Sequence, residues 1–238
     1  MANIGNVRER KTPTVQKNIF FTAGETPIVG GTLEIGHFVE PGTVLATKTI
    51  AGLSGRVGQK LVAPFRQTAD VSSSADAAAT SLVLKAPADD TSGMARNPMN
   101  LNSLYERKAA GETLTLRIYN TSTESATNYE DIAISSITVA SSTVVIASGL
   151  SSATAVNSRV VLKDGSEAAT DSTTGTRNVV ISLDYVDTRY QSQQADALQN
   201  EANVSAFFAT NGQLDFDSLI GWNSDVKSAL PMVTVVKS

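Results

Sequence analysis

The chain has 238 residues, a formal net charge of −4 and no cysteine. The lack of cysteine excludes disulfides, thiolate metal sites and cysteine nucleophiles, and a sequence pI of about 5.1 argues against a nucleic-acid binder, which usually carries a basic face. Aromatic residues make up only 5 % of the chain, whereas Val and Thr are abundant, so the composition predicts a mainly β fold with a few short helices (a β-rich α+β class) in one large or two small domains.

Residues 1–25 are predicted to form an extended N-terminal arm, because their apolar residues follow no helical period. Such an arm either docks on a partner or covers the core of its own domain. Its basic cluster suits contact with phosphate or, more commonly, a solvated tail. The candidate partner-binding residues of the arm are Ile19, Phe20, Phe21, Arg8, Arg10 and Lys11.

Residues 26–65 read as short strands separated by glycine-containing turns. Pro41 presets φ and Gly42 tolerates a positive φ, which predicts a type II turn over residues 40–43. Val44 and Leu45 then enter a strand.

Residues 66–158 are predicted to form a separate β-rich segment. Residues 66–80 contain few bulky apolar groups and indicate a loop or linker. A helix is predicted over residues 97–110, with Pro98 in its first turn and Gly111 as its stop. Residues 81–85 are a short strand candidate, and the strands at 113–119, 131–139 and 143–147 are expected to form an antiparallel meander.

Residues 159–238 return to strand patterns. Residues 160–163 run into an Asp-Gly turn, residues 178–185 (NVVISLDY) are the best strand candidate, and residues 191–203 favour a short polar helix or a loop. Residues 205–210 and 213–216 flank an Asn-Gly pair, which predicts a hairpin with a type I′ turn.

The last predicted elements are a short helix and a final strand. Asn223 or Ser224 can cap a helix that runs to Leu230 and ends at Pro231. Residues 232–236 (MVTVV) then close the chain as a strand.

Three motifs stand in a distinctive order: residues 41–45 (PGTVL), 163–169 (KDGSEAA) and 179–188 (VVISLDYVDT). This order resembles the head-decoration, or capsid-cement, proteins of lambda-like tailed bacteriophages. In that family a PGTVL strand is followed by a DG turn, a hydrophobic strand ending in DVD, and a strand pair near the C-terminus. Compact family members have only a short connection where this chain has residues 66–158, which are therefore interpreted as an inserted antiparallel β domain.

The resemblance implies a small β-barrel or sandwich core made from residues 26–65 and 159–238, in which the strands at Val44 and Val180 lie in one unit. It also implies a structural virion protein that binds the major capsid protein as a homotrimer. Made in the host cytoplasm, such a protein sits on the outer capsid surface at local three-fold positions and clamps neighbouring subunits against the pressure of packaged DNA.

The residues offer little for catalysis, and neither an enzyme nor a cofactor or metal site is expected. His37 is the only histidine, and its place beside Phe38 in a strand candidate favours a structural role. Trp222 favours packing over an interface role. Two carboxylate pairs could serve acid–base chemistry or calcium but are more typical of solvated strand ends: Asp184 with Asp187, and Asp215 with Asp217.

Two alternatives remain open besides the decoration protein. A tail or fibre module of a virion would share the same β-rich composition, and so would a secreted adhesin or carbohydrate-binding module. No stretch approaches the ~20 apolar residues of a membrane helix, and the N-terminal sequence lacks the apolar run of a secretory signal. We therefore expect no membrane partner and folding in a cytoplasm.

Overall fold

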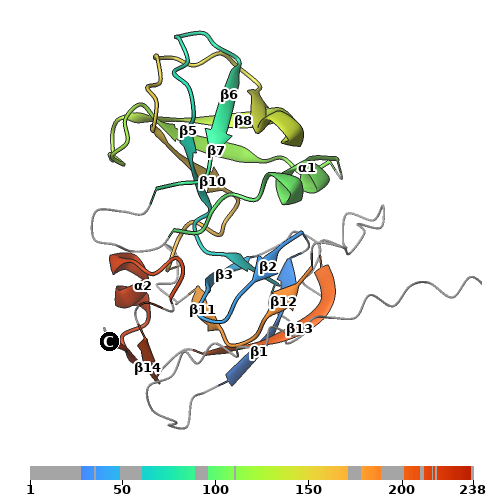
Figure 1. Ribbon diagram of the computed structural model, residues 1–238, viewed down its shortest axis with the longest axis vertical. Coiled ribbons are helices and arrows are strands. Elements are labelled where there is room, and N and C mark those ends of the chain that lie inside the picture. The colour runs from blue at the N-terminus through green and yellow to red at the C-terminus, as the bar shows by residue number, and fades with distance from the viewer. Residues whose placement is uncertain are drawn as a thin grey trace, which may run out of the picture.

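Two closed β-barrels dominate the structure, a computed structural model, and lie one above the other along the long axis of the molecule (Figure 1). The structure describes residues 28–34, 36–48, 61–88, 96–109, 111–170, 178–188, 201–209, 212–215, 217 and 219–236. Elements β1 to β15 are strands and only α1 and α2 are α-helices. The predicted β-rich α+β class with a few short helices is therefore confirmed.

The first barrel joins strands from the two ends of the chain. Its strands, in spatial order, are β1 (Ile28–Glu34), β13 (Glu201–Ala209), β11 (Val179–Ser182), β3 (Val44–Lys48) and β4 (Leu61–Pro64). All neighbours are antiparallel except β1 and β4, whose parallel pairing closes the barrel. Leu45 lies opposite Val180, so the prediction that these two stretches belong to one unit is confirmed.

Strand β11 explains why this sequence gives such a strong strand signal. Every residue of its sequence VVIS is buried. Val180 packs in one apolar cluster with Leu45. Val179 and Ile181 belong to a second cluster, the outer cluster of the first barrel, which includes residues of α2 and β15. A strand covered on both faces is expected to be continuously apolar rather than alternating.

The turn before β3 has the predicted type II form. Gly42 has a φ of +90°, and the Thr43 N–H donates to the Glu40 carbonyl at 3.1 Å. Beside it, the short strands β2 (Phe38–Val39) and β12 (Val186–Asp187) pair with each other in antiparallel fashion. The motif residues 41–45 and 179–188 thus meet through β3 and β11, and the β2 residues just before the first motif pair with β12 of the third.

The C-terminal residues form a layer against the first barrel, and here one prediction is wrong. Strand β14 (Gly212–Asp215) pairs in parallel with β15 (Val233–Val236), whereas β13 pairs with β1 and β11. The predicted hairpin of residues 205–210 and 213–216 is therefore not formed. An Asn-Gly pair permits a tight turn, but the apolar surfaces available for burial decide which strands pair.

Helix α2 (Ser224–Ala229) connects these two strands and is confirmed as predicted. Its N-cap is Asn223, whose side-chain oxygen accepts from the Val226 N–H at 2.9 Å. Leu230 follows the helix and is buried. Val226 and Ala229 of this helix pack in the outer cluster of the first barrel.

The second barrel is fully antiparallel. Its strands, in spatial order, are β10 (Arg159–Lys163), β5 (Thr68–Val71), β6 (Ser81–Lys85), β9 (Thr143–Ile146), β8 (Tyr129–Thr138) and β7 (Thr115–Tyr119), with the 3-10 helix η1 (Val139–Ser141) between β8 and β9. Strands β6 and β9 alternate as half-buried strands should: in β6, Leu82 and Leu84 face the core while their neighbours are exposed.

Two sequence boundaries of the second barrel differ from the predicted ones. Residues 66–80 were predicted as a loop or linker, yet residues 68–71 form β5, in which all four residues are buried. Residues 159–163, predicted as part of the core with residues 164–238, form β10 and pair with β5 and β7. The sequence pattern does not identify β5 as a strand because most of its side chains are small or polar. Such side chains are buried here because β5 lies where the two barrels meet and its polar groups have partners there.

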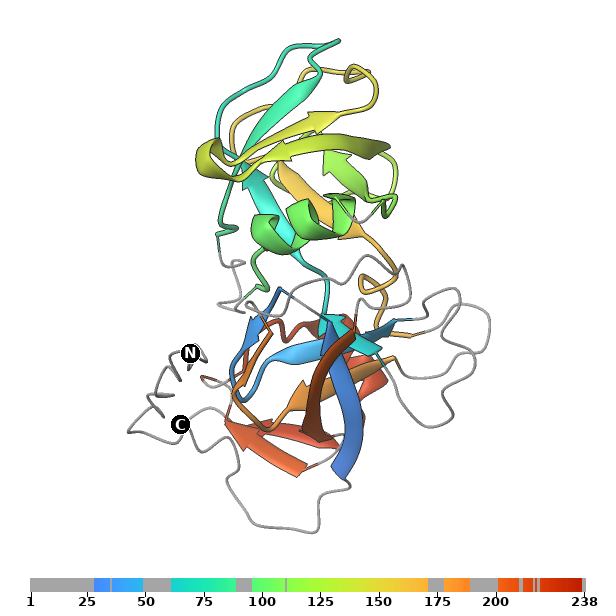
Figure 2. The same ribbon diagram turned by 90° about the vertical axis from the view of Figure 1, so that its right-hand side faces the viewer.

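Helix α1 (Leu101–Ala109) lies at the end of the second barrel that faces the first, and both views agree on this place (Figures 1 and 2). It starts later than predicted, because the Asn100 side-chain oxygen accepts from the Asn102 and Ser103 N–H groups at 3.1 and 3.2 Å and so caps it. Pro98 instead forms a bridge with Thr68. Gly111, with a φ of +92°, provides the predicted stop.

Some sequence predictions fall outside the described residues. The N-terminal arm, residues 1–25, is one of them, as are residues 191–200 of the segment 191–203 that was predicted as a short polar helix or a loop. Residues 201–203 of that segment lie in strand β13, so the prediction is wrong there. Within the described parts of the chain, neither helix has the length and apolarity needed to span a membrane.

Candidate functional site

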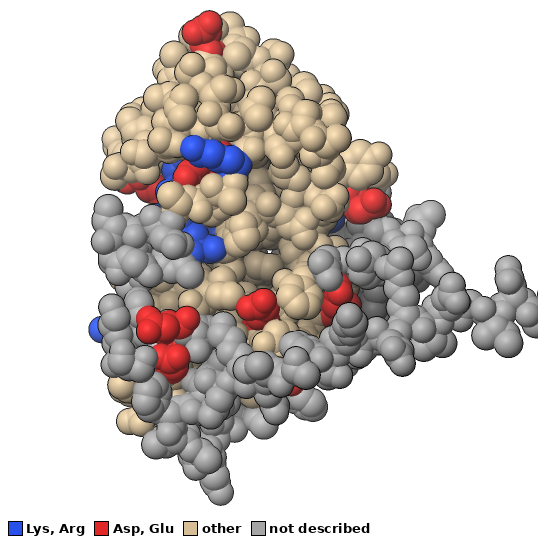
Figure 3. All heavy atoms as spheres, in the orientation of Figure 1, with Lys and Arg blue, Asp and Glu red and all other residues tan. Residues whose placement is uncertain are grey.

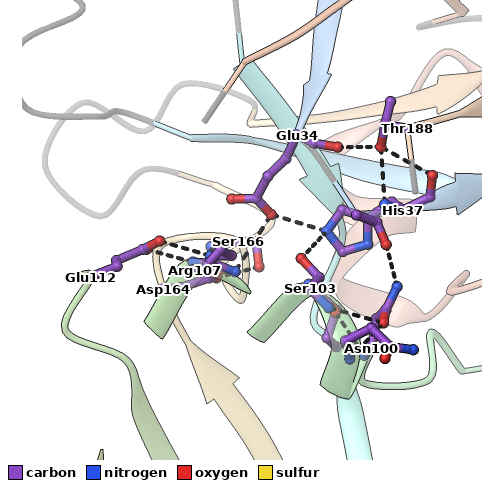
Figure 4. Close-up of polar contacts among 12 residues, drawn as sticks. Glu34, His37, Asn100, Ser103, Arg107, Glu112, Asp164, Ser166 and Thr188 are labelled. Carbon is purple, nitrogen blue, oxygen red and sulfur yellow. Dashed lines mark hydrogen bonds and ion pairs between the residues drawn. The ribbon is translucent and has the colours of Figure 1, made fainter. Parts of the chain in front are cut away.

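A buried polar cluster joins the two barrels at the end of α1 (Figure 4). At its centre is Arg107 of α1, whose side chain is 0 % exposed. Its guanidinium contacts Glu34, at the end of β1 in the first barrel, and Asp164, in the turn after β10 of the second. Glu112, just after α1, supplies a third carboxylate.

The geometry of these contacts is that of a charge-assisted fork. Arg107 donates from Nε and NH2 to the two oxygens of Glu112 at 2.8 and 2.6 Å. Its NH1 lies 2.9 Å from Asp164 Oδ2 and 3.5 Å from Glu34 Oε2. Burial by itself lowers the pKa of Arg107, but Glu34, Glu112 and Asp164 outweigh it and hold the pKa above its ordinary value.

His37 extends the cluster towards the first barrel. Its Nε2 lies 3.0 Å from Glu34 Oε2 and 3.4 Å from Ser103 Oγ. Its backbone N–H donates to the hydroxyl oxygen of Thr188 at 2.9 Å, and that hydroxyl donates to the Glu34 carbonyl at 2.7 Å. The loop after β1 is thereby tied both to the end of β12 and to α1.

The Glu34, His37 and Ser103 contacts do not form a catalytic triad. In a triad the serine and the carboxylate bind opposite nitrogens of the imidazole, so that one nitrogen accepts a proton while the other is held. Here both groups approach the same Nε2 atom. His37 is also only 2 % exposed, so a substrate has no route to it, and the geometry fits a structural role for this histidine.

A glycine allows the close approach of the loop to α1. A Cβ built on Gly36 would lie 2.9 Å from Ser103 Cβ, and its φ of +84° is unfavourable for other residues. The Asn100 side chain donates to the Gly36 carbonyl at 2.5 Å. The same asparagine therefore caps α1 and attaches it to the first barrel.

Asn97 makes a second bridge between the barrels. Its side-chain nitrogen donates to the carbonyls of Val44 and Phe65 at 3.2 and 2.6 Å, and its own carbonyl accepts from the Thr68 N–H at 2.9 Å. Gly221 packs against this side chain so closely that a Cβ there would lie 2.4 Å from Asn97 Nδ2. Both bridges use buried polar groups with partners, which makes the junction specific.

The residues singled out from the sequence fall in different places. The six partner-binding candidates of the arm, Arg8, Arg10, Lys11, Ile19, Phe20 and Phe21, lie outside the described residues. Trp222 is 4 % exposed and packs with the outer cluster of the first barrel, so its predicted packing role is confirmed. The two aspartate pairs lie at the ends of β12 and β14, Asp184 with Asp187 and Asp215 with Asp217. No group of three potential metal ligands occurs among the residues that the structure describes.

The sequence reading missed Arg107 and its acidic partners. A signal was present, because Arg107 follows the buried Ser103 and Leu104 by four and three positions and so lies on the apolar face of α1. A charged residue on that face indicates a buried ion pair. Its partners Glu34 and Asp164 are remote in sequence, and no local pattern identifies them.

Comparisons of the chain with protein-family models, with curated proteins and with solved structures find no match. The residues, the fold and the order of the motifs therefore carry any functional assignment. The structure consists of two barrels that a junction of buried polar groups holds in a defined orientation.

Proposed function

We propose that this protein is a capsid decoration protein of a tailed bacteriophage, which binds the outer surface of the head and stabilises it. The observation that carries the proposal is the meeting of the first and third motif segments in one barrel, next to the end of the second motif segment. Residues 41–45 and 179–188 are adjacent in space through the pairing of β3 with β11. Residues 163–169 lead from β10 of the second barrel to these two strands, where Ala169 packs with Val44 and Val179.

Hydrogen bonds between the motifs support this reading further. The Gly42 N–H donates to the Ser182 carbonyl at 2.8 Å, and the Ser182 N–H donates to the Thr43 carbonyl at 2.9 Å. The turn of the first motif is thus held by the strand of the third. If the motifs resembled those of the family only by chance, segments so far apart in sequence would not be expected to be direct neighbours in the fold.

The fold also has features that an adhesive virion protein needs. The junction between the barrels is made of buried, partnered polar groups, and the chain crosses it twice, at residues 65–67 and after β10. Load on one barrel is therefore transmitted to the other through covalent and non-covalent links. A contact of ~800 Å² per partner is ordinary in strength, but a homotrimer engages several capsid subunits at once, so later attachments are effectively intramolecular.

The chain order favours one orientation on the capsid. The arm, residues 1–25, leads into β1 of the first barrel, and the inserted second barrel lies at the other end of the long axis (Figure 1). With the arm on the major capsid protein, the first barrel lies at the shell and the second projects outward. An arm that adds a strand to a capsid sheet would bind through backbone hydrogen bonds, with Ile19 and Phe21 setting the register.

The test is binding to expanded, empty capsids assembled from the major capsid protein of the same genome. Cosedimentation followed by quantification should give copies in multiples of three per hexamer-like unit. A truncation lacking residues 2–22 should keep the circular dichroism and melting of the intact chain but remain in the supernatant. Saturated capsids with a copy number unrelated to three, or no binding by the intact chain, would refute the proposal.

Matched variants separate the two halves of the arm. Replacing Ile19 and Phe21 by Ser should abolish cosedimentation at every salt concentration, because it removes apolar contacts. Replacing Arg8, Arg10 and Lys11 by Gln should weaken binding only at low salt, since exposed charges are screened within ~10 Å at 0.1 M. Loss of binding in the basic variant alone would overturn the strand-addition mode while leaving the decoration role standing.

A further inference from the structure

A cleft of about 780 Å³ opens between the two barrels, next to the turn that precedes α2. Its wall includes residues of β5 and β10 from the second barrel and Trp222 from the first. Figure 3 shows basic side chains, with acidic ones near them, on this side of the molecule where the lobes meet. Cavities of roughly 300–1,000 Å³ are the usual size for small-molecule sites.

Arg159 of β10 is the most unusual residue of this wall. Its side chain is only 6 % exposed, and its Nε lies 3.2 Å from Asp70 Oδ1. Nevertheless Nε and NH1 of Arg159 make no hydrogen bond within the part of the chain that the structure describes. Asp70 is partly engaged elsewhere, because its Oδ2 accepts from the Ala88 N–H at 2.9 Å. Nε therefore faces the Asp70 carboxylate without a formed hydrogen bond, and NH1 has no acceptor among the described residues.

Arg96, a second arginine of the cleft wall, also has a donor without a hydrogen-bond partner among the described residues. Arg96 Nε is buried and has no hydrogen-bond partner among the described residues, and Arg96 NH1 reaches Glu124 Oε1 only at 3.4 Å. Glu124 is shared, because Arg66 binds it as well. Burial lowers the pKa of Arg159, and the neighbouring Arg96 and Arg66 add to this effect against Asp70 and Glu124.

Leaving a buried donor without an acceptor costs about 1–3 kcal/mol, and more for a charged group. A negatively charged group small enough to enter the cleft would satisfy these donors. A guanidinium fork matches the paired oxygens of a carboxylate or a phosphate. We propose that the cleft binds the oxyanion group, carboxylate or phosphate, of a small polar molecule, with Arg159 and Arg96 as its ligands.

The rest of the wall fits the body of such a molecule. It offers hydroxyl and amide groups from Thr123, Asn157 and Asn223, which suit a hydroxylated compound. This site is independent of the decoration role, since it lies between the barrels and not on the arm.

The chain carries its own reporter for this site, because Trp222 is its only tryptophan and lies in the cleft wall. The intact protein is titrated with sodium phosphate and, separately, with sodium glucuronate, at constant ionic strength set by sodium chloride. Tryptophan fluorescence and calorimetry should both show saturable binding. Tighter binding of glucuronate identifies a carboxylate ligand, tighter binding of phosphate identifies a phosphate ligand, and glucose serves as the neutral control.

Variants assign the binding to the two arginines. Arg159→Met and, separately, Arg96→Gln should each weaken binding by about tenfold or more, as expected for loss of a charge-assisted hydrogen bond. Arg117→Gln is the matched control, because Arg117 is paired with Asp131 on β7 and β8, outside the cleft wall. It should bind like the parent chain.

Two results would overturn the proposal. One is the absence of saturable binding of either anion by the parent chain at millimolar concentrations. The other is unchanged affinity in the cleft variants, for which circular dichroism first establishes folding. If Arg159→Met fails to fold, the parent titration and Arg96→Gln decide the question without it.

Discussion

Replacing Arg107 by Met should strongly destabilise the protein. The substitution keeps most of the side-chain volume but removes the cation that faces Glu34, Asp164 and Glu112 in a fully buried position. Removing one partner of a buried ion pair costs about 3–5 kcal/mol, because the opposite charge stays buried without compensation. For a chain of this size, about 1 kcal/mol corresponds to about 2–4 °C in Tm, so we expect Tm to fall by about 6–20 °C.

The assay is urea unfolding followed by circular dichroism, with calorimetry to locate the transitions. The matched control is Arg117→Met, which removes a bidentate pair with Asp131 on the surface of the second barrel. An exposed pair contributes only about 0–1 kcal/mol, so the control should stay close to the parent chain. The two variants remove the same group, but Arg107 is buried against three carboxylates, whereas Arg117 is partly exposed, pairs with one carboxylate and lies over the Tyr129 ring.

We also expect the loss of Arg107 to change how cooperatively the two barrels unfold. Arg107 links α1, which packs on the second barrel, to Glu34 of the first. Arg107→Met should therefore separate the melting of the two barrels into distinct calorimetric transitions. If its loss of stability matches that of Arg117→Met and melting stays as cooperative as in the parent chain, the junction does not couple the barrels and the reasoning is refuted.

Two further predictions concern packing and pH. Gly36→Ala should lower stability by about 1 kcal/mol or more, because it places a methyl group against Ser103 at a φ of +84°; urea unfolding equal to that of the parent chain would contradict this. The pKa of Asp131 is lowered, mainly by its hydrogen bond from Arg117. The pair's stabilisation, at most about 1 kcal/mol for a surface site, is therefore present above the ordinary Asp pKa of about 3.9 and lost as pH falls through the lower folded value. Asp131→Asn should be less stable than the parent chain at pH 6 and equal to it near pH 2, and a constant difference at both pH values would exclude this origin.

Much of the local structure follows from the sequence because local interactions decide it. The Pro41-Gly42 turn depends on the φ preferences of two residues, and α2 depends on one capping side chain and the proline after it. The alternation of β6 and the apolar run of β11 are both visible in the sequence, since burial on one face or two leaves different patterns.

Local sequence patterns do not predict which strands pair with each other. The pairing of β14 with β15 overrides the hairpin indicated by Asn211-Gly212, and β10 pairs with β5 and β7 of the second barrel although it adjoins the core segment in sequence. β5 itself has too few bulky apolar residues to be recognised as a strand. Each outcome depends on apolar and polar surfaces contributed by remote segments.

Composition and local patterns are sufficient to predict the β-rich class, most of the strands and both helices. The folded structure adds that two closed barrels form, that Arg107 meets carboxylates from both barrels, and that Arg159 lies buried beside a cleft. These two kinds of feature differ in the range of the interactions on which they depend. Backbone preferences and side-chain periodicity act over a few residues, whereas burial of a charge and closure of a barrel depend on groups that lie from tens of positions to more than a hundred positions apart in the chain.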